Sequence, residues 1–333
     1  MPLLKNLFIY LILFGFIFLV NKQIHLRISD YVINELLIPQ KGIVFVNQSS
    51  KNNLENGSVE YPFKKISSAL ESIEKETSLK IIKIKKGIYE ENLILPENII
   101  LSGETDYKNN ILTIIQPLDL LDKGKVIFAN NHTKLLNISV ENGKYNVYIP
   151  QDKTGILISN CKISKATKWG IFNEIHSTSK PTLDIVKTHI TKNRRQGVYL
   201  QKSTVTIKDS YLKENGEEGV DLHAGMKTYI SNIEVIGNGE GGLETEIGNI
   251  DLVIENSIFL QNGASGINLQ TFEGNSIVQI SNNLIAKNVD FGIRCALHAP
   301  IKSPYFTKMV EISSDNVFEG NGKSSIDPIC KKR

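Results

Sequence analysis

Three segments of one pattern follow one another between residues 197 and 246: Gly-Val-Tyr-Leu-Gln at 197–201, Gly-Val-Asp-Leu-His at 219–223 and Gly-Leu-Glu-Thr-Glu at 242–246. A glycine followed by an apolar residue also occurs at positions 170, 266 and 292, so the series has six glycines, and its five intervals are 27, 22, 23, 24 and 26 residues. An isoleucine stands twelve residues before each of these glycines. A period in the twenties with fixed apolar positions is typical of a solenoid, in which each coil packs against its neighbours.

Two polar columns identify the kind of solenoid. Asparagine stands four residues before five of the glycines, at 193, 215, 238, 262 and 288, while Ala166 takes this place in the first coil. A second column stands ten residues before the glycines and comprises Asn160, Lys187, Asp209, Asn232, Asn256 and Asn282. Asparagine tolerates the left-handed conformation of a tight turn, and stacked asparagines can hydrogen-bond to one another in a ladder. With the β-branched residues between the columns, this pattern predicts an all-β fold of three short strands per coil, a parallel β-helix.

The repeats resemble those of right-handed parallel β-helix proteins of the pectate-lyase-like superfamily. The segment Tyr61-Pro62-Phe63-Lys64-Lys65-Ile66, with apolar residues continuing at 69, 70 and 73, is similar to the entry segment of many bacterial members. The resemblance covers about residues 43–327 and implies a single-stranded right-handed solenoid. It also implies a capping helix over residues 61–76, which has the spacing of an amphipathic helix. Such a cap would protect the open end of the first coil from edge-to-edge association.

The ends of the chain differ from the repeats. Residues 7–20 are uninterruptedly apolar, with Lys5 before them and Lys22 after. We therefore expect a signal or anchor segment at 1–22, preferably an uncleaved membrane anchor, and a stalk at 23–42. Export of the β-helix to the cell envelope or the extracellular space follows from this expectation. Residues 105–132 fit the repeat less well, and residues 328–333 are expected to form a loose tail.

Composition restricts the partners. The net charge of +3 over 333 residues is small, and no basic stripe alternates with aromatic residues, which disfavours nucleic-acid binding. Cys295 is three residues after its glycine and is expected to be a buried small hydrophobe rather than a reactive thiol. Trp169, the only tryptophan, is expected to fill an edge rather than to serve as a platform for a sugar ring.

The alternation of strand residues predicts where chemistry can occur. The residues one and three after each glycine should face the core, so those two and four after it should face outward. Because neighbouring coils are about 4.8 Å apart, one outward patch should contain Asp221, His223, Glu244 and Glu246. The expected flanking residues are Tyr199, Gln201, Asn268, Gln270 and Arg294. The outer face of a β-helix is polar in any case, so a merely solvated surface is the competing interpretation.

Amide and aromatic neighbours suit a polysaccharide, and several chemistries fit this patch. Lyases and epimerases of uronic-acid glycans need a base beside a group that neutralises the sugar carboxylate. His223 or a neighbouring acid could be that base, with Arg294 as a distant neutralising group. The pair Asp221 and His223, followed by Glu246 one coil later, is similar to the Asp-x-His and next-coil acid of mannuronan C5-epimerases. The chain departs from that family at two positions: Leu222 stands where the family has proline, and Glu218 stands where it has tyrosine. Tyr199 of the preceding coil could supply the phenol in place of that tyrosine.

Three alternatives stay open at this point. Asp221 and Glu244 could act as a carboxylate pair in glycoside hydrolysis. Asp221, Glu244 and Glu246 could instead bind Ca²⁺ through their oxygen atoms, as the resemblance to pectate-lyase-like enzymes also suggests. The third alternative is a non-catalytic scaffold that binds glycans or serves as a surface adhesin.

Overall fold

The computed structural model describes residues 42–73, 79–119, 124–173, 181–223, 227–247, 251–271, 277–297 and 310–331. The predicted anchor at 1–22, with its apolar run 7–20, lies outside these ranges. Within them, no helix is both long and apolar enough to cross a membrane.

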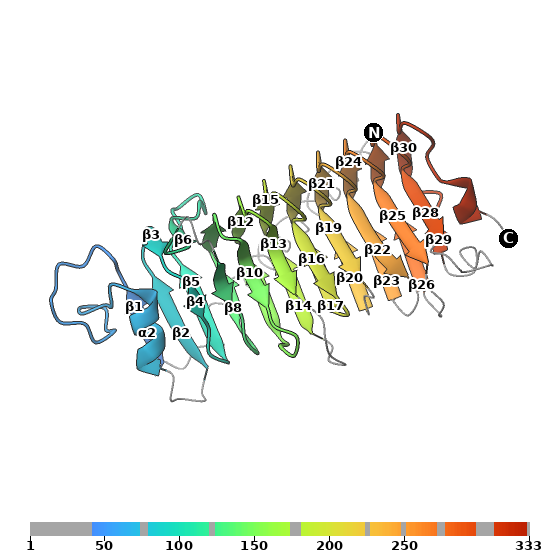
Figure 1. The fold of residues 1–333 in the computed structure, drawn as a ribbon. Coiled ribbons are helices and arrows are strands. Elements are labelled where there is room, and N and C mark those ends of the chain that lie inside the picture. The colour runs from blue at the N-terminus through green and yellow to red at the C-terminus, as the bar shows by residue number, and fades with distance from the viewer. Residues whose placement is uncertain are drawn as a thin grey trace, which may run out of the picture. The chain divides into compact units, whose positions relative to one another are not determined.

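The described chain winds through three parallel sheets, visiting each sheet once per coil (Figure 1). The first sheet has eleven strands. They are β1 (Ile43–Val46), β2 (Lys80–Ile84), β5 (Ile99–Gly103), β8 (Lys134–Leu136), β11 (Ile156–Ser159), β14 (Thr182–Val186), β17 (Thr204–Lys208), β20 (Lys227–Ser231), β23 (Asp251–Glu255), β26 (Ile277–Ser281) and β29 (Val310–Ile312).

The second sheet has ten strands. They are β3 (Gly87–Glu90), β6 (Thr113–Gln116), β9 (Ile138–Glu141), β12 (Lys162–Ser164), β15 (His189–Thr191), β18 (Tyr211–Lys213), β21 (Glu234–Ile236), β24 (Ile258–Leu260), β27 (Leu284–Ala286) and β30 (Val317–Glu319). Strand β6 and the strand β7 (Lys125–Phe128) of the third sheet both fall within residues 105–132, so the coils there are more regular than the sequence indicated.

The third sheet has nine strands and carries the predicted patch. They are β4 (Leu93–Ile94), β7 (Lys125–Phe128), β10 (Tyr145–Ile149), β13 (Trp169–Asn173), β16 (Val198–Gln201), β19 (Val220–His223), β22 (Leu243–Ile247), β25 (Ile267–Thr271) and β28 (Ile293–Leu297). All residues one and three positions after the six glycines are at most 2 % exposed, which confirms the predicted inward positions.

The asparagine ladder is present and runs through the core. Asn193, Asn215, Asn238, Asn262 and Asn288 each donate from Nδ2 to Oδ1 of the asparagine in the next coil at 2.9 Å, ending on Asn321. These residues do not have the left-handed conformation expected of them. The residue before each ladder asparagine has it instead, as at Lys192 (φ 57°) and Glu214 (φ 56°), because the ladder side chain must point inward. The second polar column does have it throughout, with φ between 50° and 54°.

The glycines of the repeat make room for this ladder. A Cβ atom on Gly219 would lie 2.9 Å from the carbonyl oxygen of Gly242 and 3.0 Å from Nδ2 of Asn238. The backbone at Gly219 has no positive φ. Close approach of one coil to the next, rather than turn conformation, therefore selects glycine at this position.

A helix packs at the N-terminal end of the solenoid. The helix α2 (Ile66–Ile73) buries Ile66, Ala69, Leu70 and Ile73, and it contacts β1 and β2. It begins at Ile66 because the Glu91 carboxylate accepts hydrogen bonds from the backbone N–H groups of Ile66 and Ser67, at 2.7 and 2.8 Å. The predicted capping helix is present within the described residues, and it is shorter than 61–76.

The C-terminal end is closed by a disulfide bond. Cys295 in β28 pairs with Cys330 in the short 3₁₀-helix η1 (Pro328–Lys331), 35 residues later. The expected burial of Cys295 is confirmed, but Cys295 is half of a disulfide bond, which was not predicted. The expectation of a loose tail was wrong for residues 328–331, which form η1. The pattern of the coils could not reveal this contact because η1 lies outside the repeat.

Candidate functional site

The predicted patch forms one connected group, the acidic cluster, which comprises Asp221, His223, Glu244 and Glu246. Parallel pairing of β19 with β22 sets Asp221 beside Glu244. The imidazole of His223 lies between two carboxylates: Nδ1 is 2.9 Å from Oε1 of Glu246, and Nε2 is 3.1 Å from Oδ2 of Asp221. Both ring nitrogens are therefore engaged by acids.

This arrangement fixes the charge of His223. Hydrogen bonds to Asp221 and Glu246 raise the pKa of His223 to about 11, against the opposing effect of burial. The ring is an imidazolium at neutral pH, held within a site where carboxylates outnumber cations. A cation with both nitrogens engaged is a poor proton acceptor, so His223 is better suited to neutralising negative charge than to acting as a base.

Glu244 is held by amide donors from the next coil. Nδ2 of Asn268 donates to Oε2 and Nε2 of Gln270 donates to Oε1, both at 2.6 Å. Burial and the nearby charge of Asp221 raise the pKa of Glu244, and the bond from Asn268 opposes this shift. Glu244 is thus an oriented carboxylate with increased basicity. Asn268 and Gln270 bind another protein side chain rather than pointing free into solvent as expected.

The remaining predicted residues lie on either side of the cluster. Tyr199 precedes Asp221 in register, and its ring centroid is 5.1 Å from that of His223. Nε2 of Gln201 donates to the Tyr199 hydroxyl at 2.7 Å. Arg294 is exposed and pairs in register with Asn268, two coils from Glu244. Within the described residues Arg294 forms no ion pair, so the structure does not bring it into the cluster.

Some side chains that the alternation of strand residues placed on the outward face are largely buried. Asp221 is 4 % exposed and Asn268 is 7 % exposed, whereas the side chain of His223 is 30 % exposed. Oδ1 of Asp221 lies 3.0 Å from Nε2 of His223, whereas Oδ1 of Asn268 is, among the described residues, a buried acceptor without a hydrogen-bond partner. Such atoms are few in native proteins and often mark a place where a ligand or water binds.

A second line of hydrogen-bonded side chains, not predicted from the sequence, lies behind the acidic cluster. Each of its members stands one residue before a repeat glycine. Nε1 of Trp169 donates to Oε1 of Gln196 at 2.6 Å. The amide of Gln196 is thereby oriented so that Nε2 donates to Oε2 of Glu218 at 3.1 Å and to Oδ2 of Asp221 at 3.2 Å.

Glu218 is an unusual carboxyl group. It is 5 % exposed, and burial, a hydrogen bond with Glu240 and the charge of Asp221 raise its pKa to about 8. Glu218 therefore holds a proton at neutral pH directly behind Asp221. The acid one residue before the glycine, unique among the six repeats, was the available sequence signal.

Six aromatic side chains precede the cluster on the same sheet and form the aromatic row. Successive ring centroids lie 4.5–5.9 Å apart, and the row ends at the ring of His223. Its members are Phe128, Tyr145, Tyr148, Trp169, Phe172 and Tyr199. Trp169 is 9 % exposed and packs inside the row, so it offers no open ring face to a sugar.

Metal binding receives no support from the geometry. Among the described residues, no three His, Cys, Asp or Glu side chains are arranged so that they could hold a metal ion. Asp221 and Glu246 point at His223, and Glu244 points at two amides. A Ca²⁺ site at Asp221, Glu244 and Glu246 therefore remains a prediction, and the chemistry below does not depend on it.

Comparison with known proteins agrees with the fold. Residues 170–331 match the family model for the right handed beta helix region, and the chain is a right-handed parallel β-helix. No curated protein matches the sequence significantly. Among solved structures, the A-module of a mannuronan C-5 epimerase from Azotobacter vinelandii has a TM-score of 0.50 and 11 % identity, over 79 % of this chain and 93 % of that one.

Two further solved structures are similar. A pectate lyase has a TM-score of 0.48 and 14 % identity, over 87 % of this chain and 78 % of its own. A mutant of the periplasmic alginate epimerase AlgG has a TM-score of 0.46 and 12 % identity, over 90 % of this chain and 85 % of its own. At identities of 11–14 %, such likeness speaks only to the fold, so the function must be argued from the site.

Proposed function

We propose that this right-handed parallel β-helix acts on a polysaccharide and removes a proton from the carbon beside a uronic-acid carboxylate, as epimerases and lyases of such glycans do. The observation that carries the proposal is the imidazolium of His223 between Asp221 and Glu246, with the basic carboxylate Glu244 in the next coil. The epimerase module named above has this fold, and a polysaccharide substrate is proposed here by analogy.

The roles follow from the charges. Glu244 is the base, because burial raises the pKa of Glu244 and two amides orient its oxygens. His223 is the group that neutralises the substrate, since an imidazolium stabilises the negative charge that develops on the sugar carboxylate as the C5 proton leaves. Asp221 and Glu246 keep His223 charged and oriented. Oδ1 of Asn268, a buried acceptor without a hydrogen-bond partner among the described residues, is the atom that a sugar hydroxyl would reach by displacing its cover.

Two outcomes of this proton transfer are compatible with the cluster. In epimerisation, Glu244 takes the C5 proton and a second group returns a proton to the opposite face of the same carbon. In elimination, the electron pair of the C5–H bond forms a C4–C5 double bond, and the pair of the C4–O bond leaves with the glycosidic oxygen. The Tyr199 hydroxyl, beside His223, is the candidate for the second proton donor.

A non-catalytic glycan-binding scaffold is the second candidate. The 4 % exposure of Asp221 and the engagement of both His223 nitrogens are also what an ion cluster that only stabilises the coils would show. Turnover distinguishes the two candidates.

We also propose that the protein is exported. The disulfide bond between Cys295 and Cys330 supports this, since such bonds persist in oxidising compartments and are rare in the cytosol. The apolar run at 7–20 provides a segment for membrane targeting, either as an anchor or as a signal.

The test is turnover of polyuronates by the full chain. Exchange of the C5 proton with deuterated water and absorbance of unsaturated sugars are measured together on polymannuronate and polygalacturonate. We expect Glu244→Gln and His223→Gln each to lower the rate about 100-fold or more. Glu60→Gln, an exposed loop carboxylate, serves as the control and should keep the full rate.

Activity that persists in both site variants would contradict the proposed roles. No exchange and no product with the folded wild-type protein, on either polymer, would favour the binding scaffold.

A further inference from the structure

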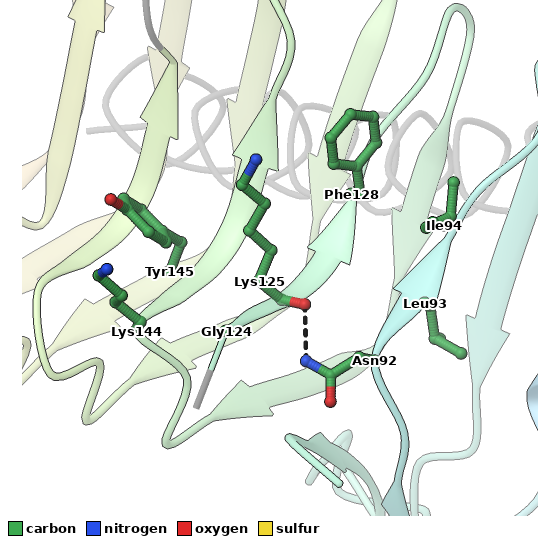
Figure 2. Close-up of a pocket in the computed structure, with 8 residues that line it drawn as sticks. All are labelled: Asn92, Leu93, Ile94, Gly124, Lys125, Phe128, Lys144 and Tyr145. Carbon is green, nitrogen blue, oxygen red and sulfur yellow. Dashed lines mark hydrogen bonds between the residues drawn. The ribbon is translucent and has the colours of Figure 1, made fainter. Parts of the chain in front are cut away.

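A hollow lies beside Phe128 and Tyr145, at the end of the aromatic row away from the acidic cluster. Figure 2 shows the residues that line it. Its volume is about 420 Å³, within the range of about 300–1,000 Å³ that is usual for ligand sites. It is formed by β4, β7 and β10 and lined by Asn92, Leu93, Ile94, Gly124, Lys125, Phe128, Lys144 and Tyr145. Unlike the central rings of the row, Phe128 and Tyr145 are only half-buried, and Ile94 is 75 % exposed.

The charges of the hollow are positive and unpaired. Nζ of Lys125 lies 3.5 Å from the ring centroid of Tyr148, and Nζ of Lys144 lies 5.6 Å from that of Tyr145. Neither lysine forms an ion pair with a carboxylate in the described part of the chain. Lysines elsewhere do, as Lys165 with Glu141 and Lys213 with Glu234. Two cations beside exposed apolar and aromatic walls suit a carboxylated sugar, whose ring contacts Phe128 and Tyr145 while its carboxylate faces the lysines.

The hollow and the acidic cluster share one column of side chains. Parallel pairing aligns Ile94, Phe128, Tyr148, Phe172, Tyr199, Asp221 and Glu244 across successive strands of the third sheet. Four coil steps separate Phe128 from Asp221, which is about 19 Å at the usual strand spacing. The face is therefore cationic at one end and acidic at the other, with closely packed rings between.

We propose that the hollow binds a carboxylated sugar unit of the same glycan chain whose reacting unit lies at the acidic cluster. This inference rests on the proposed function and adds two features to it: the substrate is an anionic glycan, and it must be long enough to span the aromatic row. Lys125 and Lys144 select charge, while Asp221 and His223 lie at the reacting unit. A neutral polysaccharide gains nothing from the two lysines.

The test is calorimetric titration of the full chain carrying Asp221→Asn, which prevents turnover during the measurement. The ligands are oligomannuronates of three and eight units and a neutral mannan of eight units. The variant is the pair Lys125→Gln and Lys144→Gln. The matched control is Lys83→Gln with Lys134→Gln, which removes the same charge from the first sheet.

We expect the Lys125 and Lys144 changes to weaken binding of the eight-unit uronate about tenfold. The three-unit uronate, which is too short to reach the hollow and the acidic cluster together, should bind more weakly than the eight-unit one. The control variant should bind the eight-unit uronate as tightly as the protein that keeps all four lysines. The Lys125 and Lys144 changes should not alter binding of the neutral mannan, and added salt should reduce the effect on the uronate. Unchanged binding of the long uronate in the variant would overturn the inference, as would equal affinity for the neutral mannan.

The two proposals fail separately. If the Lys125 and Lys144 variant binds normally while the wild-type protein still exchanges the C5 proton, the hollow is not a subsite and the proposed function stands. If binding depends on the lysines but the wild-type protein exchanges no proton, the subsite stands without catalysis. If no glycan binds at all, both proposals are overturned.

Discussion

At the scale of single residues, the site is governed by where protons reside. Asp221 lies between the imidazolium of His223 and the protonated carboxyl group of Glu218. The amide of Gln196 donates hydrogen bonds to Asp221 and to Glu218. The pKa of a buried acid rises when a carboxylate lies beside it, because two negative charges at close range are unfavourable. At neutral pH the site thus holds one proton on His223, within the acidic cluster, and one on Glu218, directly behind it.

Glu218 gives this arrangement a signature in the pH dependence of stability. In the folded protein its pKa is about 8, against 4.5 for an ordinary glutamate. Between pH 4.5 and 8 the unfolded chain loses this proton and the folded chain keeps it, so the free energy of unfolding falls as pH rises. Each pKa unit of difference corresponds to about 1.4 kcal/mol.

We therefore expect Glu218→Gln, which mimics the protonated acid, to lose less stability than the wild-type protein between pH 5 and 6.5. His223 keeps its proton in the folded state over that window, so the comparison isolates Glu218. Urea unfolding at several pH values measures the effect, with Glu60→Gln as control. Parallel curves for the wild-type protein and Glu218→Gln would mean that Glu218 is ionised in the folded state.

At the scale of the elements, the coil is defined by turns and by the ladder between coils. Left-handed residues end the strands of the first and second sheets, while the ladder asparagines bind from coil to coil. Both columns were predicted from the sequence. The left-handed conformation was expected for the ladder asparagines, which do not have it. The reason is that asparagine suits both tasks, and only the direction of its side chain decides between them.

The ladder should contribute strongly to stability. Asn238 is 2 % exposed, accepts from N and Nδ2 of Asn215, and donates to Oδ1 of Asn262 and to the carbonyl of Leu212. Asn238→Ala leaves these buried groups unsatisfied, at about 1–3 kcal/mol for each group. We expect a loss of about 3 kcal/mol or more in chemical denaturation.

The control for this variant is Asn232→Gly, at an exposed position with φ of 54°. Glycine accepts that conformation, so the free energy of unfolding of Asn232→Gly should be close to that of the wild-type protein. Equal stability of Asn238→Ala and Asn232→Gly would show that the ladder contributes little.

At the scale of the whole solenoid, the two ends are protected differently. The helix α2 packs at the first coil, and η1 with its disulfide bond closes the last (Figure 1). The repeat predicts the coils between these ends because every coil must bury the same inward positions. It does not predict the cap at the C-terminal end, nor which outward side chains cover one another, since contacts such as Gln196 with Asp221 depend on neighbours in other coils.

The disulfide bond allows a direct test of the C-terminal cap. Cys330→Ser should lower the free energy of unfolding by about 2–4 kcal/mol, because the cross-link closes a loop in the unfolded chain. Reductant should destabilise the wild-type protein to the same degree and leave Cys330→Ser unchanged, since the two cysteines that this variant keeps, Cys161 and Cys295, are buried and form no disulfide bond with each other. A wild-type protein indifferent to reductant would contradict the cross-link.

The protonation state of His223 tests the whole account of the site most directly. Nitrogen–proton correlation spectra of the histidine side chains, with His223→Gln to assign the signal, report whether each ring nitrogen carries a proton. We expect His223 to remain an imidazolium throughout the range from pH 6 to pH 9, because its pKa is raised to about 11. A ring that loses its proton near pH 6.5, the ordinary value for histidine, would contradict the charge arrangement from which the proposed roles of Asp221, Glu244 and Glu246 are derived.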